Sequence, residues 1–167
     1  MVKNKNNRAI WSNRIKKDTS VLFQKVGNSI NVDKRLYKED IKGSIAHVEM
    51  LFKQKIIPFR IKNKILYGLN KIEKEISKNK LKLDENYEDI HMNIEKRLFQ
   101  IIGEEAGYVH TARSRNDQVI TDFKIWIKSS TKEINQNLNK LIKTILKVSE
   151  KNIKTLMPGF TPVSYTH

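Results

Sequence analysis

The sequence contains no cysteine, and only three prolines and six glycines interrupt its 167 residues. The absence of cysteine excludes a disulfide scaffold and a thiolate metal site. No apolar run approaches the ~20 residues that a membrane-spanning helix needs, and no apolar signal-peptide core follows the basic residues 1–8. These absences predict a cytoplasmic protein with no membrane partner. No two histidines have the spacing of a helical zinc site, so no metal is predicted; they are His47, His91, His110 and His167.

Acidic residues are few beside the basic ones, with 18 aspartates and glutamates against 33 lysines and arginines and a net charge of +15. Such an excess can indicate nucleic-acid binding. Here the basic residues are mostly lysines scattered among asparagine and isoleucine, and arginine, the usual reader of phosphates and bases, is scarce. The sequence therefore predicts no nucleic-acid partner, although the excess charge favours the attraction of an anionic substrate.

The scarcity of proline and glycine leaves long stretches with helical periodicity. Apolar residues step by three or four along residues 41–52, 61–76 and 90–101, and each stretch predicts an amphipathic helix. Pro58 is expected in the first turn of the second helix, where its missing N–H costs nothing. The lysine-rich stretch 77–88 predicts a loop, and Gly103 is expected to end the third helix.

The longest apolar pattern begins at Val119, and from Ile134 to Val148 it steps by four and three as a heptad-like seam. The proline and glycine at 158–159 are expected to end it. A helix of that length, ~50 Å at 1.5 Å per residue, is longer than the rest of a compact domain of this size. Its seam needs partner helices, so the chain is predicted to be either an oligomer or a piece of a longer helical bundle. The predicted fold class is all-α.

Two short polar segments at helix edges carry residues suited to a binding site. In residues 24–33, Ser29 lies in a Gly-Asn-Ser loop where its N–H and hydroxyl can face a ligand, although this segment by itself favours an ordinary turn with a capping serine. In residues 88–95, Asp89 is expected to cap a helix with His91 in the first turn. That histidine either orients or relays a proton for a neighbouring group or is simply a partly buried histidine beside a cap.

A third polar segment, residues 111–118, places two arginines, a serine and an asparagine just before the long helix. Ser114 or Asn116 is a natural N-cap. A helix N-terminus offers free N–H groups and the positive end of the helix dipole, which together form an anion site. Arg115 adds a group able to grip a carboxylate with two hydrogen bonds. The segment therefore predicts an anion site, and a charged, well-capped loop is the alternative.

The same segment carries a resemblance to a known family. His110 to Gln118 reads His-Thr-Ala-Arg-Ser-Arg-Asn-Asp-Gln and is similar to a signature of argininosuccinate lyases in the fumarase/aspartase superfamily. The Ser-Arg-Asn-Asp-Gln loop resembles that branch rather than fumarase, aspartase or adenylosuccinate lyase. Further family motifs are matched in the right order over nearly the whole chain, at residues 29–36, 40–47, 88–95 and 157–161. At the N-terminus, Ser12 and Asn13 replace the two glycines of the family's Trp-Gly-Gly-Arg.

The resemblance implies an N-terminal lyase domain with an extended arm over residues 1–112, and the start of a central helical-bundle domain over residues 113–167. The family cleaves argininosuccinate to arginine and fumarate by β-elimination without a cofactor, as a homotetramer whose active sites draw on three subunits. Hydrogen-bond donors stabilise the carbanion, whose charge spreads into a neighbouring carboxylate. By matching motif, Ser29, Asn116 and Thr161 would contact the substrate, Ser114 and Arg115 would support the carboxylate site, and Asp89 and His91 would have an orienting role.

Two catalytic residues of the family have no counterpart in this sequence. The family has a histidine after the threonine matched by Thr161, and here that position is Pro162. The family's catalytic serine would lie beyond residue 167. The tail resembles a later stretch of the family, so His167 is not the missing histidine. We therefore expect an inactive fragment without a catalytic residue of its own; the alternative is a non-catalytic structural or interaction protein that keeps the lyase scaffold.

Overall fold

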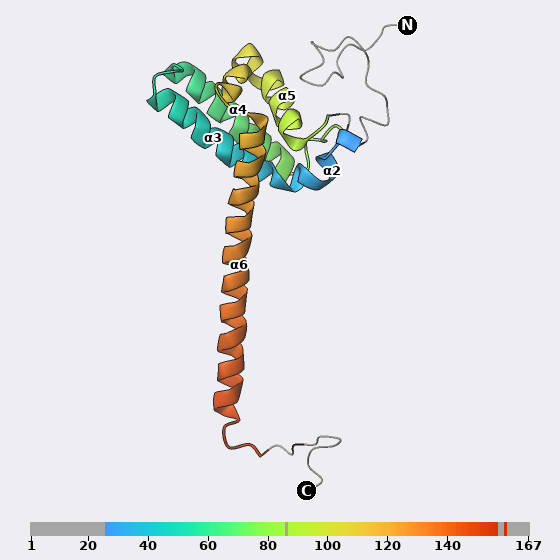
Figure 1. Cartoon of the computed structure of the whole chain (residues 1–167), viewed down its shortest axis with the longest axis vertical. Helices are drawn as coiled ribbons and strands as arrows, with labels where there is room; N and C mark the ends of the chain where they lie inside the picture. Colours follow the sequence, from blue (N-terminus) through green and yellow to red (C-terminus); the bar gives the residue numbers. More distant parts are fainter. Residues whose placement is uncertain (1–25, 86, 157–158, 160–167) are drawn as a thin grey trace. The chain divides into compact units, whose positions relative to one another are not determined.

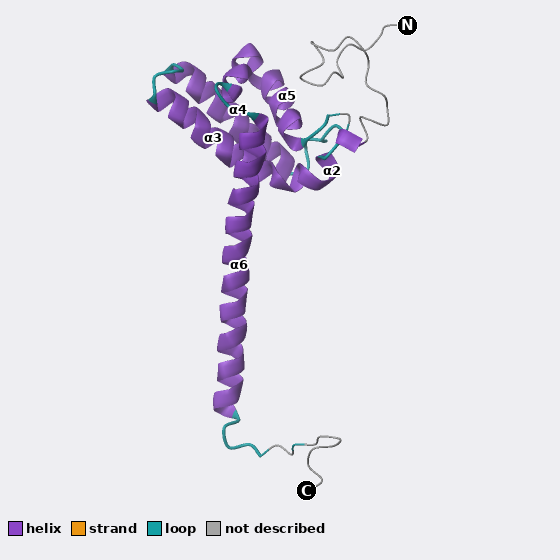
Figure 2. Cartoon of the chain, viewed as in Figure 1, coloured by secondary structure: helices purple, strands orange, loops and turns teal. Residues whose placement is uncertain are grey.

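The computed structural model describes residues 26–85, 87–156 and 159. Every regular element in these ranges is a helix, which confirms the all-α fold class (Figures 1 and 2). None of these helices is both long and apolar enough to cross a membrane. The elements are α2 (Ile30–Asp33), η2 (Lys34–Leu36), α3 (Tyr37–Lys53), α4 (Phe59–Ser77), α5 (Ile90–Ile102), η3 (Gly103–His110) and α6 (Arg115–Lys151).

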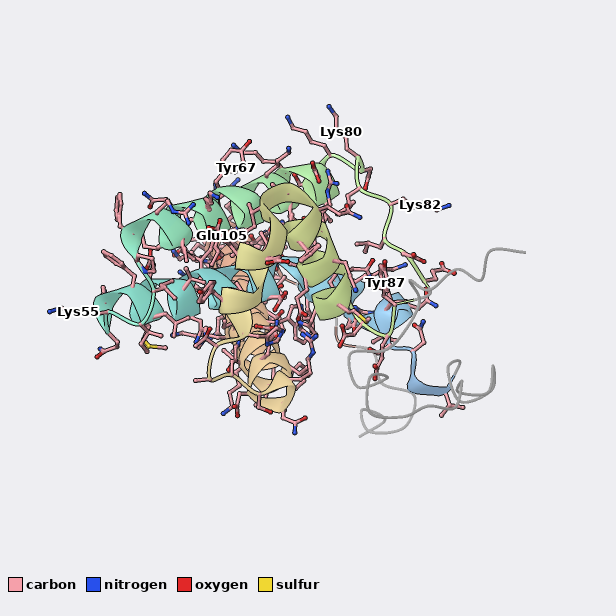
Figure 3. All side chains as sticks on the ribbon, turned by 90° about the horizontal axis from the view of Figure 1, so that it is seen from above. Lys55, Tyr67, Lys80, Lys82, Tyr87 and Glu105 are labelled. Atoms are coloured by element: carbon pink, nitrogen blue, oxygen red, sulfur yellow. The ribbon has the colours of Figure 1, made fainter. Side chains whose placement is uncertain are left out.

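The chain divides into two compact units, Met1–Trp126 and Ile127–His167. In the first unit, α3, α4 and α5 pack around one apolar core, with η3 against it. The predicted periodicity is confirmed, because the apolar stripes of all three helices face that core. Lysines of the connecting turns, such as Lys55, Lys80 and Lys82, project away from the ribbon (Figure 3). The fully buried core side chains include Ile41, Val48, Leu51, Ile65, Leu69, Ile72, Ile90 and Leu98.

The helices α4 and α5 approach each other closely at Gly68. A Cβ at this position would overlap Cδ1 of Leu98, which is itself buried. A larger residue would therefore hold α5 away from α4 and disturb the packing of the core.

The helix ends follow local sequence signals. Asp89 caps α5 as predicted, because its Oδ1 accepts a hydrogen bond from the Met92 N–H at 2.6 Å. Gly103 ends α5 as predicted, with a φ of 77° that suits glycine. Pro58 immediately precedes α4 in an extended conformation and so does not lie in its first turn. The apolar periodicity did not predict η3, because a 3₁₀ segment has a different repeat.

The helix α6 is 37 residues long, and its part from Ile127 onward belongs to the second unit. It ends at Lys151, before the proline and glycine that were expected to end it. The side chains of the predicted seam are 50–59% exposed, so the seam has no partner within the described part of the chain. These side chains are Ile134, Leu138, Leu141, Ile145 and Val148.

Candidate active site

The first two polar segments pack against each other within the first unit. The Ser29 N–H donates to the Glu88 carbonyl at 2.8 Å, and Nδ2 of Asn28 donates to the Glu85 carbonyl at 2.5 Å. From the adjoining helical turn, Oδ1 of Asp33 accepts from the Ile90 N–H at 3.2 Å. The loop that carries Ser29 is thus held against the N-terminus of α5, although almost sixty residues separate them.

The hydroxyl of Ser29 is exposed and donates to Oδ2 of Asp33 at 2.6 Å. Burial raises the pKa of Asp33 above its ordinary value, and the charge of Asp89 adds to that effect, whereas the hydrogen bond from Ser29 opposes it. The same hydroxyl also lies 3.4 Å from the Glu88 carbonyl, so it links the Ser29 loop to both Asp33 and the segment before α5.

Arg115, the first residue of α6, connects that helix to α5. Its Nη2 lies 2.7 Å from Oε1 of Glu95, and its Nε lies 3.6 Å from Oδ2 of Asp89. Its Nη1 donates to Oε1 of Gln118 at 2.8 Å. Nε2 of His110 also contacts Oε1 of Glu95. The guanidinium is therefore engaged by side chains of the protein, and it orients the start of α6.

Ser114 immediately precedes α6, and its Oγ accepts a hydrogen bond from the Asn116 N–H at 3.2 Å. Of the two capping candidates, Ser114 is therefore the one that fills the role. Asn116 lies one residue inside the helix, and its side chain is exposed. The exposed amide of Asn116 thus sits at the positive end of the helix dipole, where an anion is favoured.

Two further contacts hold the loop that precedes α6 against α3. Nη1 of Arg113 donates to Oγ of Ser44 at 3.0 Å. Nε2 of His47 lies 2.9 Å from the Thr111 carbonyl. Because a carbonyl only accepts, this nitrogen of His47 carries the proton.

Ala112 in the same loop has a φ of 54°, in the left-handed region that side chains with a Cβ adopt at a cost. Replacing Ala112 with glycine is therefore expected to raise the free energy of unfolding by about 0.5–1 kcal/mol, because the relieved strain of about 1–2 kcal/mol exceeds the entropy that glycine adds to the unfolded chain. Urea denaturation of the purified variant measures this change. Ala106, buried in η3, is the matched control, since glycine there should destabilise the chain; equal losses at both positions would contradict the strain at Ala112.

A buried polar cluster lies between α3, α5 and the first turns of α6. His91 is 2% exposed, Asp40 is 1% exposed and Asp122 is fully buried. Nδ1 of His91 lies 3.0 Å from Oδ1 of Asp40 and 3.5 Å from Oδ2 of Asp122. Nε2 of Gln118 donates to Oδ1 of Asp40. Among the described residues, these three form the group of three or more histidine and acidic side chains that lie close enough together to hold a cation.

The three titratable groups shift one another's pKa values. Burial, and then the charge of Asp40, raise the pKa of Asp122 to about 8. Burial also acts to raise the pKa of Asp40, but His91 and Gln118 outweigh it and hold that pKa below its ordinary value. Burial acts to lower the pKa of His91, but Asp40 outweighs it and raises that pKa.

Sequence reasoning singled out His91 but not Asp40 or Asp122. The burial of both aspartates could have been predicted from polar residues that repeat every four positions along their helices. Asp40 lies four residues before Ser44 on the buried side of α3, and Gln118 lies four residues before Asp122 on the buried side of α6. Polar residues that repeat on an inward-facing stripe indicate a buried polar contact between helices.

The structure brings together Ser29, Asp89, His91, Ser114, Arg115 and Asn116 within the first unit, at the N-termini of α5 and α6. His91 is 2% exposed, so it is more deeply buried than the partly buried histidine that the sequence offered as the alternative to an orienting group. Thr161, Pro162 and His167 lie outside the described residues, as do the N-terminal Ser12 and Asn13.

Comparison with known proteins supports the resemblance. The family model described as Lyase matches residues 13–164. Over its whole length the chain is 75% identical to an argininosuccinate lyase of Pelagibacter ubique (strain HTCC1062) and 40% identical to one of Bartonella bacilliformis, and it covers 37% of each. Over 91% of its length it is 48% identical to an argininosuccinate lyase of Ehrlichia chaffeensis, of which it covers 32%. The chain spans about a third of the length of these curated relatives. It belongs to the lyase family and matches the N-terminal portion of argininosuccinate lyases.

Proposed function

We propose that this chain supplies substrate-binding segments for the cleavage of argininosuccinate to arginine and fumarate. The observation that carries the proposal is the meeting of three matched motifs, which bear Ser29, Asp89 and Asn116, at the N-termini of α5 and α6. The identity of 75% to an argininosuccinate lyase favours that substrate over those of other elimination enzymes. A cytoplasmic location and a role in arginine biosynthesis belong to the same proposal.

The chemistry assigned to these residues follows from the charge that develops during β-elimination. Loss of a proton beside a carboxylate places negative charge on its oxygens, and fixed donors stabilise that charge. The amide of Asn116 is a suitable donor, because Ser114 and Arg115 hold its backbone in place. Ser29 and Thr161 are proposed as further contacts to the substrate, and Asp89 and His91 as orienting residues.

Residues 113–167 are proposed as the start of a central helical bundle, and residues 1–112 as the N-terminal domain. The exposed seam of α6 supports self-association, with a homotetramer as the proposed state.

Replacing both Leu138 and Leu141 with lysine should lower the mass of the assembly, because charges would enter the apolar interface. Analytical ultracentrifugation measures that mass. Gln136→Lys, off the seam, is the control, and an unchanged mass of the double variant would contradict the role of the seam.

The chain of 167 residues by itself is expected to form no measurable fumarate from argininosuccinate. Pro162 follows Thr161 where the family has a histidine, so a proton-transfer group is missing. Ultraviolet absorbance of fumarate measures the rate. Robust turnover by the purified chain would contradict this expectation.

A chimeric protein tests the proposed function itself. Residues 1–151 of this chain replace the matching part of the Pelagibacter relative, which supplies everything that follows. The chimera should restore growth without arginine to a bacterial strain that lacks argininosuccinate lyase. Failure of a well-expressed and folded chimera to do so, where the intact relative succeeds, would count against the proposal.

A further inference from the structure

The buried cluster of Asp40, His91, Gln118 and Asp122, here called the Asp40 cluster, poses a problem of charge. Two carboxyl groups and an imidazole are almost completely removed from solvent, and one oxygen or nitrogen atom of each lies within 4.8 Å of the others. Two carboxylates that close together in a buried site repel each other strongly, and one of them is expected to keep its proton. Neither oxygen of Asp122 has a hydrogen-bond partner among the described residues. A buried, unpartnered carboxylate is costly, whereas a protonated carboxyl can donate to its neighbour.

The hydrogen bonds of Gln118 indicate which carboxyl is ionised. Its Oε1 accepts from Arg115, and its Nε2 donates to Oδ1 of Asp40. Arginine has no acceptor, so this amide cannot be turned round without losing both contacts. Asp40 therefore receives a donor on the oxygen that also lies 3.0 Å from Nδ1 of His91. Asp122 receives no such donor, which makes Asp40 the carboxylate and Asp122 the acid.

We propose that the Asp40 cluster is a buried proton-binding site, in which the acid Asp122 donates its proton to the carboxylate of Asp40 beside a protonated His91. The site connects three helices, because Asp40 belongs to α3, His91 to α5 and Asp122 to α6. It goes beyond the proposed function, since it holds whether or not the chain takes part in catalysis. Its structural effect is to hold the N-terminal turns of α5 and α6, which carry Asp89 and Asn116, against α3.

Other charged groups face the cluster and do not reverse this assignment. The positive charge of Arg113 opposes protonation of Asp122, but burial and the charge of Asp40 outweigh it in raising the pKa of Asp122. Near His91, the charge of Asp89 raises the pKa and that of Arg115 lowers it, and Asp40 has a larger effect than either. The groups that face the cluster are Asp33, Asp89, Arg113 and Arg115.

The proposal gives stability a defined dependence on pH. The pKa of Asp122 is raised in the folded chain. Its contribution to the free energy of unfolding is therefore complete below pH 3.8 and is lost as the pH rises towards about 8. The pKa of His91 is also raised, so its contribution is lost as the pH rises above 6.5. The pKa of Asp40 is lowered, so its contribution is lost only as the pH falls below 3.8. The cluster therefore stabilises the chain most in mildly acidic solution.

The test compares the wild-type chain with Asp122→Asn and Asp40→Asn in urea denaturation from pH 5 to 9. Asparagine resembles a protonated aspartate, so Asp122→Asn should remove the dependence on pH that arises from this proton. Relative to Asp122→Asn, the wild-type ratio of folded to unfolded chain should fall about tenfold per pH unit between pH 5 and 7. Asp40→Asn should be less stable than both at every pH up to 7, because Asp40 is the required acceptor.

A second measurement applies even if a variant does not fold. In the wild-type chain, carbon-13 NMR should show the Asp122 carboxyl ionising well above pH 4 and that of Asp40 below it. Ordinary titration of Asp122 near pH 4, or parallel stability curves for the wild type and Asp122→Asn, would overturn the proposal. A divalent ion bound at one per chain in the purified protein and lost with Asp122→Asn would also overturn it, because the ion would then take the place of the proton.

Discussion

Replacing Asp40 with asparagine is expected to lower the free energy of unfolding by about 3–5 kcal/mol at pH 6, the usual cost of removing one partner of a buried charge pair. Asp40 is 1% exposed, and it faces Nδ1 of His91 and Nε2 of Gln118. In the variant, His91 would lose the nearer of its two carboxyl groups and keep only Asp122, at 3.5 Å. Urea denaturation followed by circular dichroism measures the loss.

The neighbouring Glu39→Gln is the matched control for this prediction. Glu39 is only partly buried, so its neutralisation should change the free energy of unfolding by no more than about 0.5 kcal/mol. If Asp40→Asn were as mild as Glu39→Gln, the Asp40 cluster would not connect α3 to α5 and α6 in the way proposed.

Replacing Asn116 with alanine in the chimera is expected to lower kcat/KM for argininosuccinate by about 10²–10³, the usual effect of removing a donor to a developing anion. The side chain of Asn116 is exposed at the N-terminus of α6, so its loss should leave the thermal stability almost unchanged. Activity and melting temperature are measured on the same preparation. This combination separates a role in binding the substrate from a role in folding.

Asn63→Ala is the control for that variant, because Asn63 is an exposed asparagine on α4, away from the matched motifs. Its kcat/KM should equal that of the unmodified chimera. Equal activity of Asn116→Ala and Asn63→Ala would remove Asn116 from the proposed substrate contacts.

The sequence predicted the helices well because each depends on signals within a short stretch. The apolar spacing along 61–76 corresponds to α4, and the side chains of Ile65 and Leu69 from that spacing are buried. Asp89 and Gly103 bound α5 as predicted, because capping depends on residues within one turn. The exposed seam of α6 also agrees with the sequence, which indicated a helix in need of partners.

The Asp40 cluster was not predicted, because it depends on contacts between residues far apart in the chain. Asp40 and Gln118 are separated by 78 positions. Neither the periodicity of α3 nor that of α6 specifies which polar residue of one helix meets which residue of the other. The resemblance pointed to His91 but gave no reason for its burial, and the two carboxyl groups beside it supply that reason.

The structure also changes the expected role of Arg115. The sequence indicated a guanidinium able to grip a carboxylate of the substrate, and that group instead contacts Glu95, Asp89 and Gln118. We therefore expect Arg115 to act through the position of Asn116, in keeping with its proposed supporting role. A sequence alone cannot distinguish these two uses of an arginine, because both require only a charged residue before a helix.

The rate of fumarate formation by the purified chimera tests the central claim most directly. If residues 1–151 carry working substrate-binding segments, the chimera should cleave argininosuccinate at a rate comparable with that of the intact Pelagibacter relative. The chain of 167 residues, assayed alongside, should give no signal. A chimera that folds and assembles as the relative does, yet forms no fumarate, would contradict the account.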